Sequence, residues 1–417
     1  MYSAVDRGVW CSEVHRGCQA QFHSHDSVVG VSCLAAMAAS NVEGSQHNRA
    51  GKEIIMQPPI TSEVVVAYAQ CPRKAYLLLF GPEQGIPHEY IRILERQRQE
   101  NHERYVNLLQ HNHADVHPYT VENLRNGRSV LLNARLQAEG YEATCSALRR
   151  VEGTSSGGTP WYEPTICVGT YSINTDQKRE LVFTGYVLAH VQHTPPVAGS
   201  MIGVDGRTHT IKLDKSATDL LSLLAPLRAW TTTAAPEPPP IILNKHCPLC
   251  PFQRLCHAQA EQEDNLSLLD SLSTAKMVKK YARKGIFTVN QLSCLYRPRK
   301  QRKRSRKSVV PRHDVALQAL VIRTGKIFIL RRPELSRQPV EIFLDIEGIP
   351  DQHRYYLMGL FICEGERGTY HAVWADTGAE EEQMWHQFLT LLQEYPDAPL
   401  YHYGSYEPKA IATLGHR

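Results

Sequence analysis

Four cysteines have the spacing of a metal or cluster site. Cys247, Cys250 and Cys256 lie within ten residues of one another, and Cys71 lies far upstream in Tyr-Ala-Gln-Cys-Pro-Arg-Lys-Ala-Tyr. Three thiolates at this spacing can face one point, and a fourth from elsewhere in the chain completes a four-thiolate shell for an iron–sulfur cluster or a zinc ion. Such a site would join two distant parts of one domain.

Two other roles are open to these cysteines. Free cysteines are commonly buried as small hydrophobic side chains, and cysteines form disulfides in oxidising compartments. However, Pro248 and Pro251 flank Cys250 and oppose a helix between the thiols. The spacing therefore favours a metal or cluster site over core packing or disulfides.

Carboxylates near the end of the chain form a second candidate site. The segment Glu-Ile-Phe-Leu-Asp-Ile-Glu-Gly reads as an apolar strand, and Asp345 and Glu347 would lie on one face of it. Such a pair can bind Mg2+ or Mn2+ for phosphodiester hydrolysis. Glu407 follows a later predicted strand. The alternative is a solvated strand end whose charges bind nothing.

Both sites need a scaffold of helices and strands. Apolar periodicity predicts a helical segment over 62–80 that is interrupted at Cys71, and a helix over 87–109. Further predicted elements are strands over 129–136, 141–151 and 161–169, helices over 177–193 and 215–230, two short strands within 318–330, strands over 355–363, 369–375 and 399–403, and a helix over 380–394. The pattern is that of an α/β protein with two sheets.

The cysteine arrangement resembles that of the RecB-like nucleases, including the CRISPR-associated RecB-like exonucleases and the AddB nuclease domain. Those proteins use one N-terminal cysteine and a C-terminal triplet. The resemblance implies a 4Fe-4S cluster bound by Cys71, Cys247, Cys250 and Cys256, with zinc as the alternative. Arg73 and Tyr76 resemble the Cys-x-Arg-x-x-Tyr of that family.

The RecB-like resemblance also implies a metal-binding catalytic core, which this chain matches only in part. Glu163 stands where a metal carboxylate is expected, but Thr165 stands where the family has lysine. Ser146 takes what resembles the aspartate position, and a hydroxyl is a poor substitute for a carboxylate on Mg2+. Gln177 and Tyr186 are the nearest matches to the family's helix residues.

The C-terminal strands resemble the YprB ribonuclease H-like domain, a subgroup of the DEDD-type 3'-5' exonucleases. Asp345 and Glu347 match its first motif and Glu407 its second. The third motif, which carries a final aspartate and a histidine or tyrosine base, is expected beyond residue 417. We therefore expect little RNase H-type activity from these 417 residues alone.

Basic residues between the two modules point to nucleic acid. Residues 273–295 predict two helices joined at Gly285, as in a helix-hairpin-helix motif whose backbone amides bind phosphate. The basic side chains are Lys279, Lys280, Arg283 and Lys284 in this segment, and Arg302, Lys303, Arg304 and Arg306 in the block that follows. Phosphate contacts by these side chains would give salt-sensitive affinity. The alternatives are an ordinary helix connector and a solvated linker.

Length and composition fit an assembly of this kind. The chain has 417 residues, 42% of them hydrophobic, and a net charge of +4. No 18-residue apolar run exists, so we expect a soluble protein with no membrane partner. Eleven cysteines, four of them committed to a cofactor, indicate the reducing cytoplasm.

We predict four segments. They are a disordered or spurious extension (1–55), a RecB-like, restriction-endonuclease-like α/β domain with a cluster staple (56–265), a helix-hairpin-helix-like segment with a basic linker (266–312), and a partial RNase H-like mixed α/β domain (313–417). The expected function is that of a DNA-processing nuclease, acting on DNA rather than RNA beside a helicase domain or subunit. One alternative is a catalytically eroded nucleic-acid-binding module with a structural cluster, and another is a zinc-stapled interaction protein.

Overall fold

The computed structural model describes residues 58–82, 85–151, 161–213, 217–233, 236–297, 314–329 and 338–416. The chain divides into two units, Met1–Met56 and Gln57–Arg417, and all of the described residues belong to the second. The predicted extension over 1–55 and the basic block with Arg302, Lys303, Arg304 and Arg306 lie outside the described residues. Among the described helices, none combines the length and the apolar character that crossing a bilayer requires.

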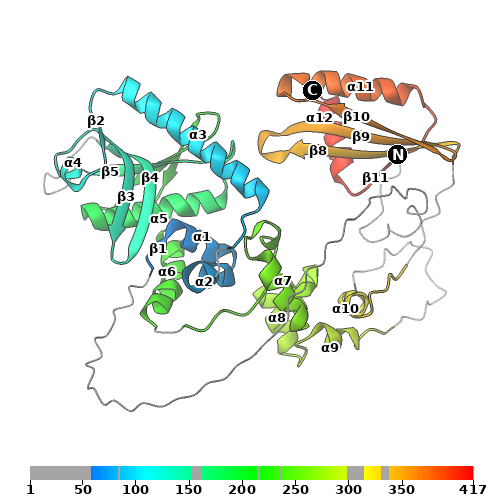
Figure 1. The fold of residues 1–417 in the computed structure, drawn as a ribbon, viewed down its shortest axis with the longest axis horizontal. Helices are drawn as coiled ribbons and strands as arrows, with labels where there is room; N and C mark the ends of the chain where they lie inside the picture. Colours follow the sequence, from blue (N-terminus) through cyan, green and yellow to red (C-terminus); the bar gives the residue numbers. More distant parts are fainter. Residues whose placement is uncertain are drawn as a thin grey trace, which may run out of the picture. The chain divides into compact units, whose positions relative to one another are not determined.

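The first sheet is mixed and has the strand order β2-β3-β4-β5-β6-β7, with β1 paired to β4 (Figure 1). Its strands are β1 (Ile60–Thr61), β2 (Val116–Pro118), β3 (Val130–Ala138), β4 (Tyr141–Arg150), β5 (Tyr162–Cys167), β6 (Ala198–Ile202) and β7 (Thr208–Lys212). The predicted strands over 129–136, 141–151 and 161–169 are confirmed as β3, β4 and β5. The hairpin of β6 and β7 was not predicted.

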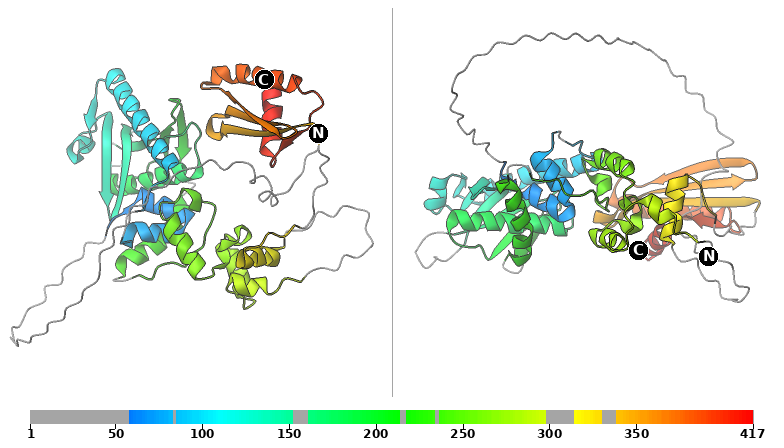
Figure 2. Two further views of the ribbon diagram at one scale, coloured as in Figure 1. Left: turned by 45° about the vertical axis from the view of Figure 1, so that its right-hand side comes forward. Right: turned by 90° about the horizontal axis from the view of Figure 1, so that it is seen from below.

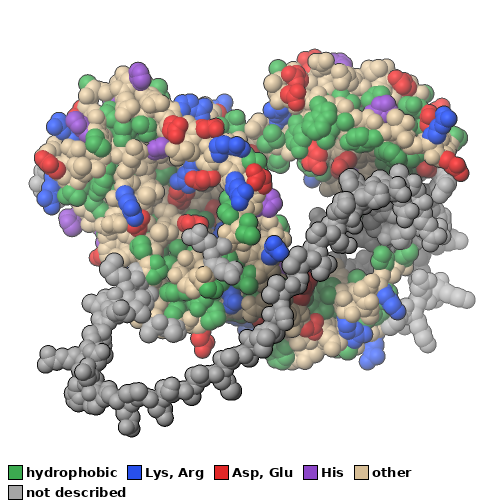
Figure 3. Space-filling view, in the orientation of Figure 1, with side chains coloured by type: hydrophobic (Ala, Val, Ile, Leu, Met, Phe, Trp, Pro, Cys, Tyr) green, Lys and Arg blue, Asp and Glu red, His purple; other side chains and the backbone are tan. Residues whose placement is uncertain are grey.

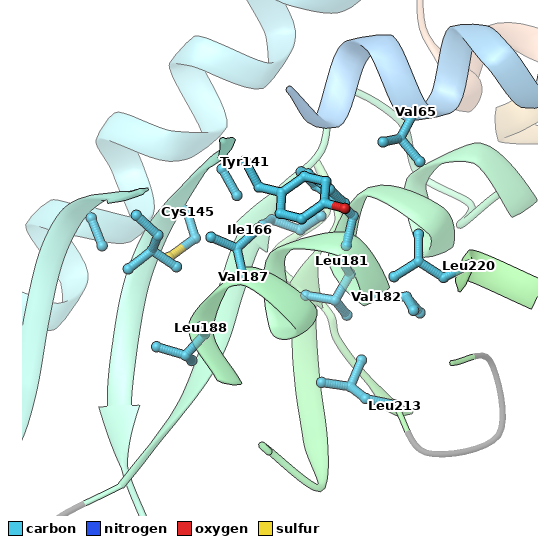
Figure 4. Close-up of a cluster of buried hydrophobic side chains, with 14 of the residues drawn as sticks. Val65, Tyr141, Cys145, Ile166, Leu181, Val182, Val187, Leu188, Leu213 and Leu220 are labelled. Atoms are coloured by element: carbon cyan, nitrogen blue, oxygen red, sulfur yellow. The ribbon is translucent and has the colours of Figure 1, made fainter. Parts of the chain in front are cut away.

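Two hydrophobic cores cover the two faces of this sheet. On one face, α5 (Thr175–Gln192) and α6 (Ala217–Thr232) pack with side chains such as Tyr141, Cys145 and Ile166 (Figure 4). On the other face, Tyr105 and Leu109 of α3 (Glu89–Asn112) pack against Val130 and Leu132. Most charged side chains of α3 are exposed and carry both signs (Figure 3), whereas Arg98 is half-buried and pairs with Glu180 of α5. Because β5 is covered on both faces, nearly all of its residues are buried.

Two short helices bring Cys71 beside the cysteine triplet. α1 (Ser62–Gln70) ends at Cys71, and α2 (Pro72–Phe80) begins directly after it. Pro72 forces Cys71 into an extended conformation, which separates the two helices as the sequence predicts. α7 (Gln253–Gln262) carries Cys256 and lies beside α2 in both views of Figure 2.

The middle segment forms a small helical cluster. α8 (Ala275–Ala282), α9 (Val289–Ser293) and α10 (Val315–Thr324) share a core with Leu266, Leu269 and Leu272. The prediction of two short strands within 318–330 is wrong, because residues up to Thr324 are helical. Asp314 caps the first turn of α10, and Gly325 ends the helix with a φ of 62°. These capping signals outweigh the β-branched character of the segment.

The second sheet has the order β10-β9-β8-β11. β8 (Val340–Ile349), β9 (Arg354–Glu364) and β10 (Arg367–Trp374) are antiparallel, and β11 (Leu400–His402) runs parallel to β8. α11 (Glu381–Gln393) and α12 (Tyr406–Gly415) cover one face through Met384, Phe388, Ala410 and Leu414. The predicted order of three strands, a helix and a strand is confirmed. The described residues thus form a mixed α/β fold with two mixed sheets.

Candidate functional site

The four predicted cysteine ligands line one pocket. Cys71 comes from the junction of α1 and α2, Cys247 and Cys250 from a short turn, and Cys256 from α7. The same pocket is lined by Arg73, Lys74, Ile241, Ile242, Leu243, Asn244, His246, Phe252 and Gln253. The fold therefore brings together thiols that are far apart in the sequence, as the spacing predicts.

Local backbone geometry directs hydrogen bonds to two of the sulfurs. The N–H of Asn244 donates to Sγ of Cys247 at 3.2 Å, and the N–H of Phe252 donates to Cys250. Both donors lie within three residues of the cysteines that they contact. Hydrogen bonds of this kind favour the thiolate, which is the form that binds metal.

Burial opposes ionisation of these thiols in the absence of metal. It raises the pKa of Cys247 and Cys250, and it raises the pKa of Cys256 to about 11, with neighbouring thiols adding to the effect. The cations Lys74 and Arg73 act in the opposite direction on the pKa of Cys250 and Cys256. A metal that binds here must therefore displace protons.

At the position that resembles the catalytic aspartate of the RecB-like nucleases, the chain has a buried serine. Ser146 lies on β4 under α3, and its Oγ lies 2.9 Å from Nδ1 of His102. The same hydroxyl accepts a hydrogen bond from the N–H of Cys167 at 3.2 Å. His102 is not among the predicted residues, although the RecB-like nucleases that the sequence resembles usually have a histidine or glutamate early in the domain.

The other predicted residues of this core are distributed over two faces of the sheet. Glu163 and Thr165 alternate with Tyr162 and Ile166, which pack in the α5 core, so the first pair faces the α3 side. Oε1 of Glu163 accepts a hydrogen bond from the N–H of Ala198 at 3.0 Å. Glu163 is therefore half-buried beside the start of β6.

Gln177 and Tyr186 have structural contacts. Gln177 completes a capping box with Asn174 at the start of α5 and donates to Oγ1 of Thr170 at 2.8 Å. Tyr186 packs against Tyr141 and His190 on the α5 side of the sheet. The structure thus separates Tyr186 from Glu163 by the thickness of the sheet.

Asp345 and Glu347 lie on the exposed face of β8, which is the central strand beside β11. Both are exposed and alternate with Leu344 and Ile346, which are buried under α11 and α12. Their neighbours on β9 are Gly359 and Leu357. The predicted placement of two carboxylates on one strand face is confirmed.

Glu407 does not share this exposed surface. It lies in the first turn of α12, is 5% exposed, and its Oε2 lies 3.7 Å from Nδ1 of His402. Both of these atoms are buried, and neither has a hydrogen-bond partner among the residues that the structure describes. Since Ala410 and Leu414 of the same helix pack against Leu344 and its neighbours, α12 covers the face opposite to Asp345.

The described parts of the chain contain no group of three or more His, Cys, Asp or Glu side chains arranged to hold one metal ion. This holds for the cysteine pocket, for Glu163 in the first sheet, and for the carboxylates of the second module. A four-iron cluster differs from a single ion, because its thiolates bind different iron atoms.

The α8–α9 hairpin has the predicted helix, Gly285 turn and helix, with a φ of 74° at Gly285. The expectation that its backbone amides bind phosphate finds no support in the described residues, because these amides have partners within the chain. The N–H groups of Phe287 and Thr288 donate to the Gln291 side chain, and that of Asn290 donates to Oδ2 of Asp264. The N–H groups of Lys284, Gly285, Ile286, Val289 and Gln291 also have partners within the chain.

The basic side chains of this hairpin remain available. Lys279, Lys280, Arg283 and Lys284 are all exposed. Lys284 additionally places its Nζ 5.8 Å from the ring centre of Tyr281. Any phosphate contact here would be made by side chains.

The arrangement of β8 to α12 corresponds to a known family. Residues 342–417 match the model of the RNase_H superfamily. The match begins in β8, includes Asp345, Glu347 and Glu407, and supports a nuclease-like function that involves nucleic acid. No curated protein matches the chain.

Proposed function

We propose that the protein is a metal-dependent nuclease that hydrolyses phosphodiester bonds in DNA. The observation that carries this proposal is the pair Asp345 and Glu347 on the exposed face of β8, within the segment that matches the RNase_H superfamily. In this proposal, residues 342–417 form a YprB-type exonuclease module and the first sheet forms a RecB-like module. Such a protein would work beside a helicase.

The two carboxylates fit a divalent cation. Their oxygens are the ligands that Mg2+ and Mn2+ prefer. To other described residues, neither side chain forms a hydrogen bond or an ion pair, so both keep their oxygens for a ligand. A bound Mg2+ or Mn2+ would activate water and neutralise charge on the phosphate.

We further propose a 4Fe-4S cluster in the cysteine pocket, bound by Cys71, Cys247, Cys250 and Cys256. The proposal is supported by the four thiols that line one pocket and by the N–H donors to Cys247 and Cys250. The cluster would join the start of the RecB-like module to its end and add to folding stability. Iron, sulfide and zinc analysis of anaerobically purified protein separates the cluster from the zinc alternative.

A nuclease assay with Mn2+ tests the assignment. Asp345→Asn and Glu347→Gln remove charge from the second sheet, and Glu163→Gln removes it from the first. We expect the first two variants to remove the low turnover that these residues support on single- or double-stranded DNA, and Glu366→Gln, an exposed control on the β9–β10 turn, to leave it unchanged. Turnover that survives all three site substitutions would overturn the site assignment.

The alternative is a nucleic-acid-binding protein whose catalytic sites are eroded. Ser146 and Thr165 in the first module favour it, because neither offers a carboxylate or an ammonium group. The position of Glu407 on the helix-covered face also favours it. Salt-sensitive DNA binding without turnover under any metal would support this alternative.

A further inference from the structure

One arginine contacts the chain on both sides of the cysteine triplet. Nη1 of Arg73 donates to the main-chain oxygen of Pro239 at 2.9 Å, and its Nη2 donates to Oε1 of Gln259 at 3.0 Å. Pro239 precedes Cys247 in the sequence, and Gln259 follows Cys256 on α7. Arg73 itself lies two positions after Cys71. Its guanidinium therefore connects both ends of the triplet segment to the helix that begins at Cys71.

The segment before the triplet is held by hydrogen-bond donors from other parts of the chain. Its sequence is Pro-Glu-Pro-Pro-Pro over 236–240, and proline has no N–H group with which to build a strand ladder or a helix. Its carbonyl oxygens remain available as acceptors. The hydroxyl of Tyr76 donates to the oxygen of Pro236 at 3.1 Å, and Arg73 donates to that of Pro239.

Two further contacts support the same junction. Nδ2 of Asn244 donates to the oxygen of Gln70 at 3.4 Å, directly before Cys71. Nε2 of Gln259 donates to Oε1 of Glu263 at 2.8 Å, which turns the oxygen of this amide toward Arg73. Of these contacts, those of Arg73 reach both the proline segment and α7.

We propose that Arg73 is the positioning residue of the cysteine pocket, and that it holds Cys71 beside the triplet before any metal binds. The assignment of a cluster to this pocket rests on the proposed function. The proximity of the four thiols does not, because all four line one pocket in the structure. An arginine suits this role because its planar guanidinium presents two nitrogens in fixed directions. Lysine carries the same charge on a single nitrogen and cannot reproduce both contacts.

The first test uses metal-free protein and diamide as the probe. Diamide takes two protons and two electrons from a pair of thiols, which leaves one disulfide and one hydrazine derivative. Peptide mapping then reports the fraction of Cys71 that is linked to Cys247, Cys250 or Cys256. We expect this fraction to be high in the wild type and to fall by about tenfold in Arg73→Lys, because the thiols lose effective concentration when the contacts are lost.

Arg254→Lys is the matched control, since Arg254 is exposed on α7 beside the triplet. It should cross-link like the wild type. Of the two Arg73 contacts, Gln259→Ala removes the one with α7 and leaves the one with Pro239, so it should give an intermediate yield. If Arg73→Lys does not fold, the cross-linking yield of Gln259→Ala decides the test instead. Equal cross-linking in the wild type, Arg73→Lys and Gln259→Ala would overturn the inference.

The second test is reconstitution with iron and sulfide, read by visible absorbance and iron per chain. We expect lower iron occupancy in Arg73→Lys than in Arg254→Lys. If the wild type forms the Cys71 cross-link in an Arg73-dependent way but binds no iron, the positioning role stands and the cluster proposal fails. If the wild type and Arg73→Lys bind iron equally and cross-link equally, the cluster proposal stands and the positioning role fails.

Discussion

Nδ1 of His102 lies 2.9 Å from Oγ of Ser146, where α3 crosses β4. In the RecB-like resemblance, this serine takes the position of a metal-binding aspartate. A histidine nitrogen and a carboxylate oxygen at this separation would be two ligands for one ion, whereas a histidine and a hydroxyl form a hydrogen-bonded pair. Whether residue 146 is a serine or an aspartate therefore decides whether this pair forms a structural contact or a metal site.

Ser146→Asp should restore metal binding to this position. Without metal, we expect the buried carboxylate to lower the free energy of unfolding by about 1–3 kcal/mol. Addition of Mn2+ should recover part of this loss, and thermal unfolding with and without MnCl2 measures both effects. Ser146→Asn has a similar size and no charge, so it should not respond to Mn2+. Equal responses of the two variants would show that this core does not accept an ion.

Glu407 should cost stability in its present position. Its carboxylate is buried and lies 3.7 Å from His402, and its Oε2 has no hydrogen-bond partner within the described parts of the chain. Replacing poorly compensated buried charge with an apolar side chain often stabilises a fold, so we expect Glu407→Met to raise the free energy of unfolding by about 1–3 kcal/mol.

Urea denaturation at pH 7 measures this change. Glu366→Met, at an exposed position, should change the free energy of unfolding by less than about 0.5 kcal/mol. A large loss of stability in Glu407→Met would show instead that the carboxylate contributes to the fold.

The buried thiol of Cys145 should make stability depend on alkaline pH. Burial raises its pKa from 9.0 to about 12. In the unfolded chain the thiol loses its proton near its ordinary pKa, while the folded protein retains it. The contribution of this thiol to stability is therefore complete below pH 9 and is lost as the pH rises from 9 toward 12.

Thermal unfolding between pH 8 and pH 10.5 tests this linkage. The melting temperature of Cys145→Ala should fall less steeply with pH than that of the wild type. Cys294→Ala removes an exposed thiol and should retain the wild-type slope. If all three proteins show the same slope, another group controls the alkaline transition.

Neutralising the hairpin cations should weaken nucleic-acid binding at low salt. We expect the combined change of Lys279, Lys280, Arg283 and Lys284 to glutamine to reduce the slope of log affinity against log salt by up to about 3.6, because each lost phosphate contact on duplex DNA removes about 0.9. Fluorescence anisotropy with labelled DNA over a salt series measures the slope. Lys409→Gln, at an exposed position on α12, is the control. An unchanged slope would mean that this face is merely solvated.

The sequence determined most of the local elements and the partners of the cysteine pocket. Apolar alternation predicted β3, β4 and β5, and Pro72 predicted the break between α1 and α2, because these signals act over a few neighbouring residues. The hairpin of β6 and β7 was missed although it contains Asp205-Gly206, a turn signal. The apolar run of α10 is short, so periodicity alone predicts strands there, whereas the caps Asp314 and Gly325 mark the ends of a helix.

The tertiary structure decided which side chains meet. No periodicity in the sequence indicates that His102 faces Ser146, that Glu407 is buried beside His402, or that Arg73 reaches Pro239 and Gln259. These contacts join segments whose relative placement depends on how helices pack on sheets. A local pattern fixes the face on which a side chain lies, but long-range packing fixes the partner that it finds there.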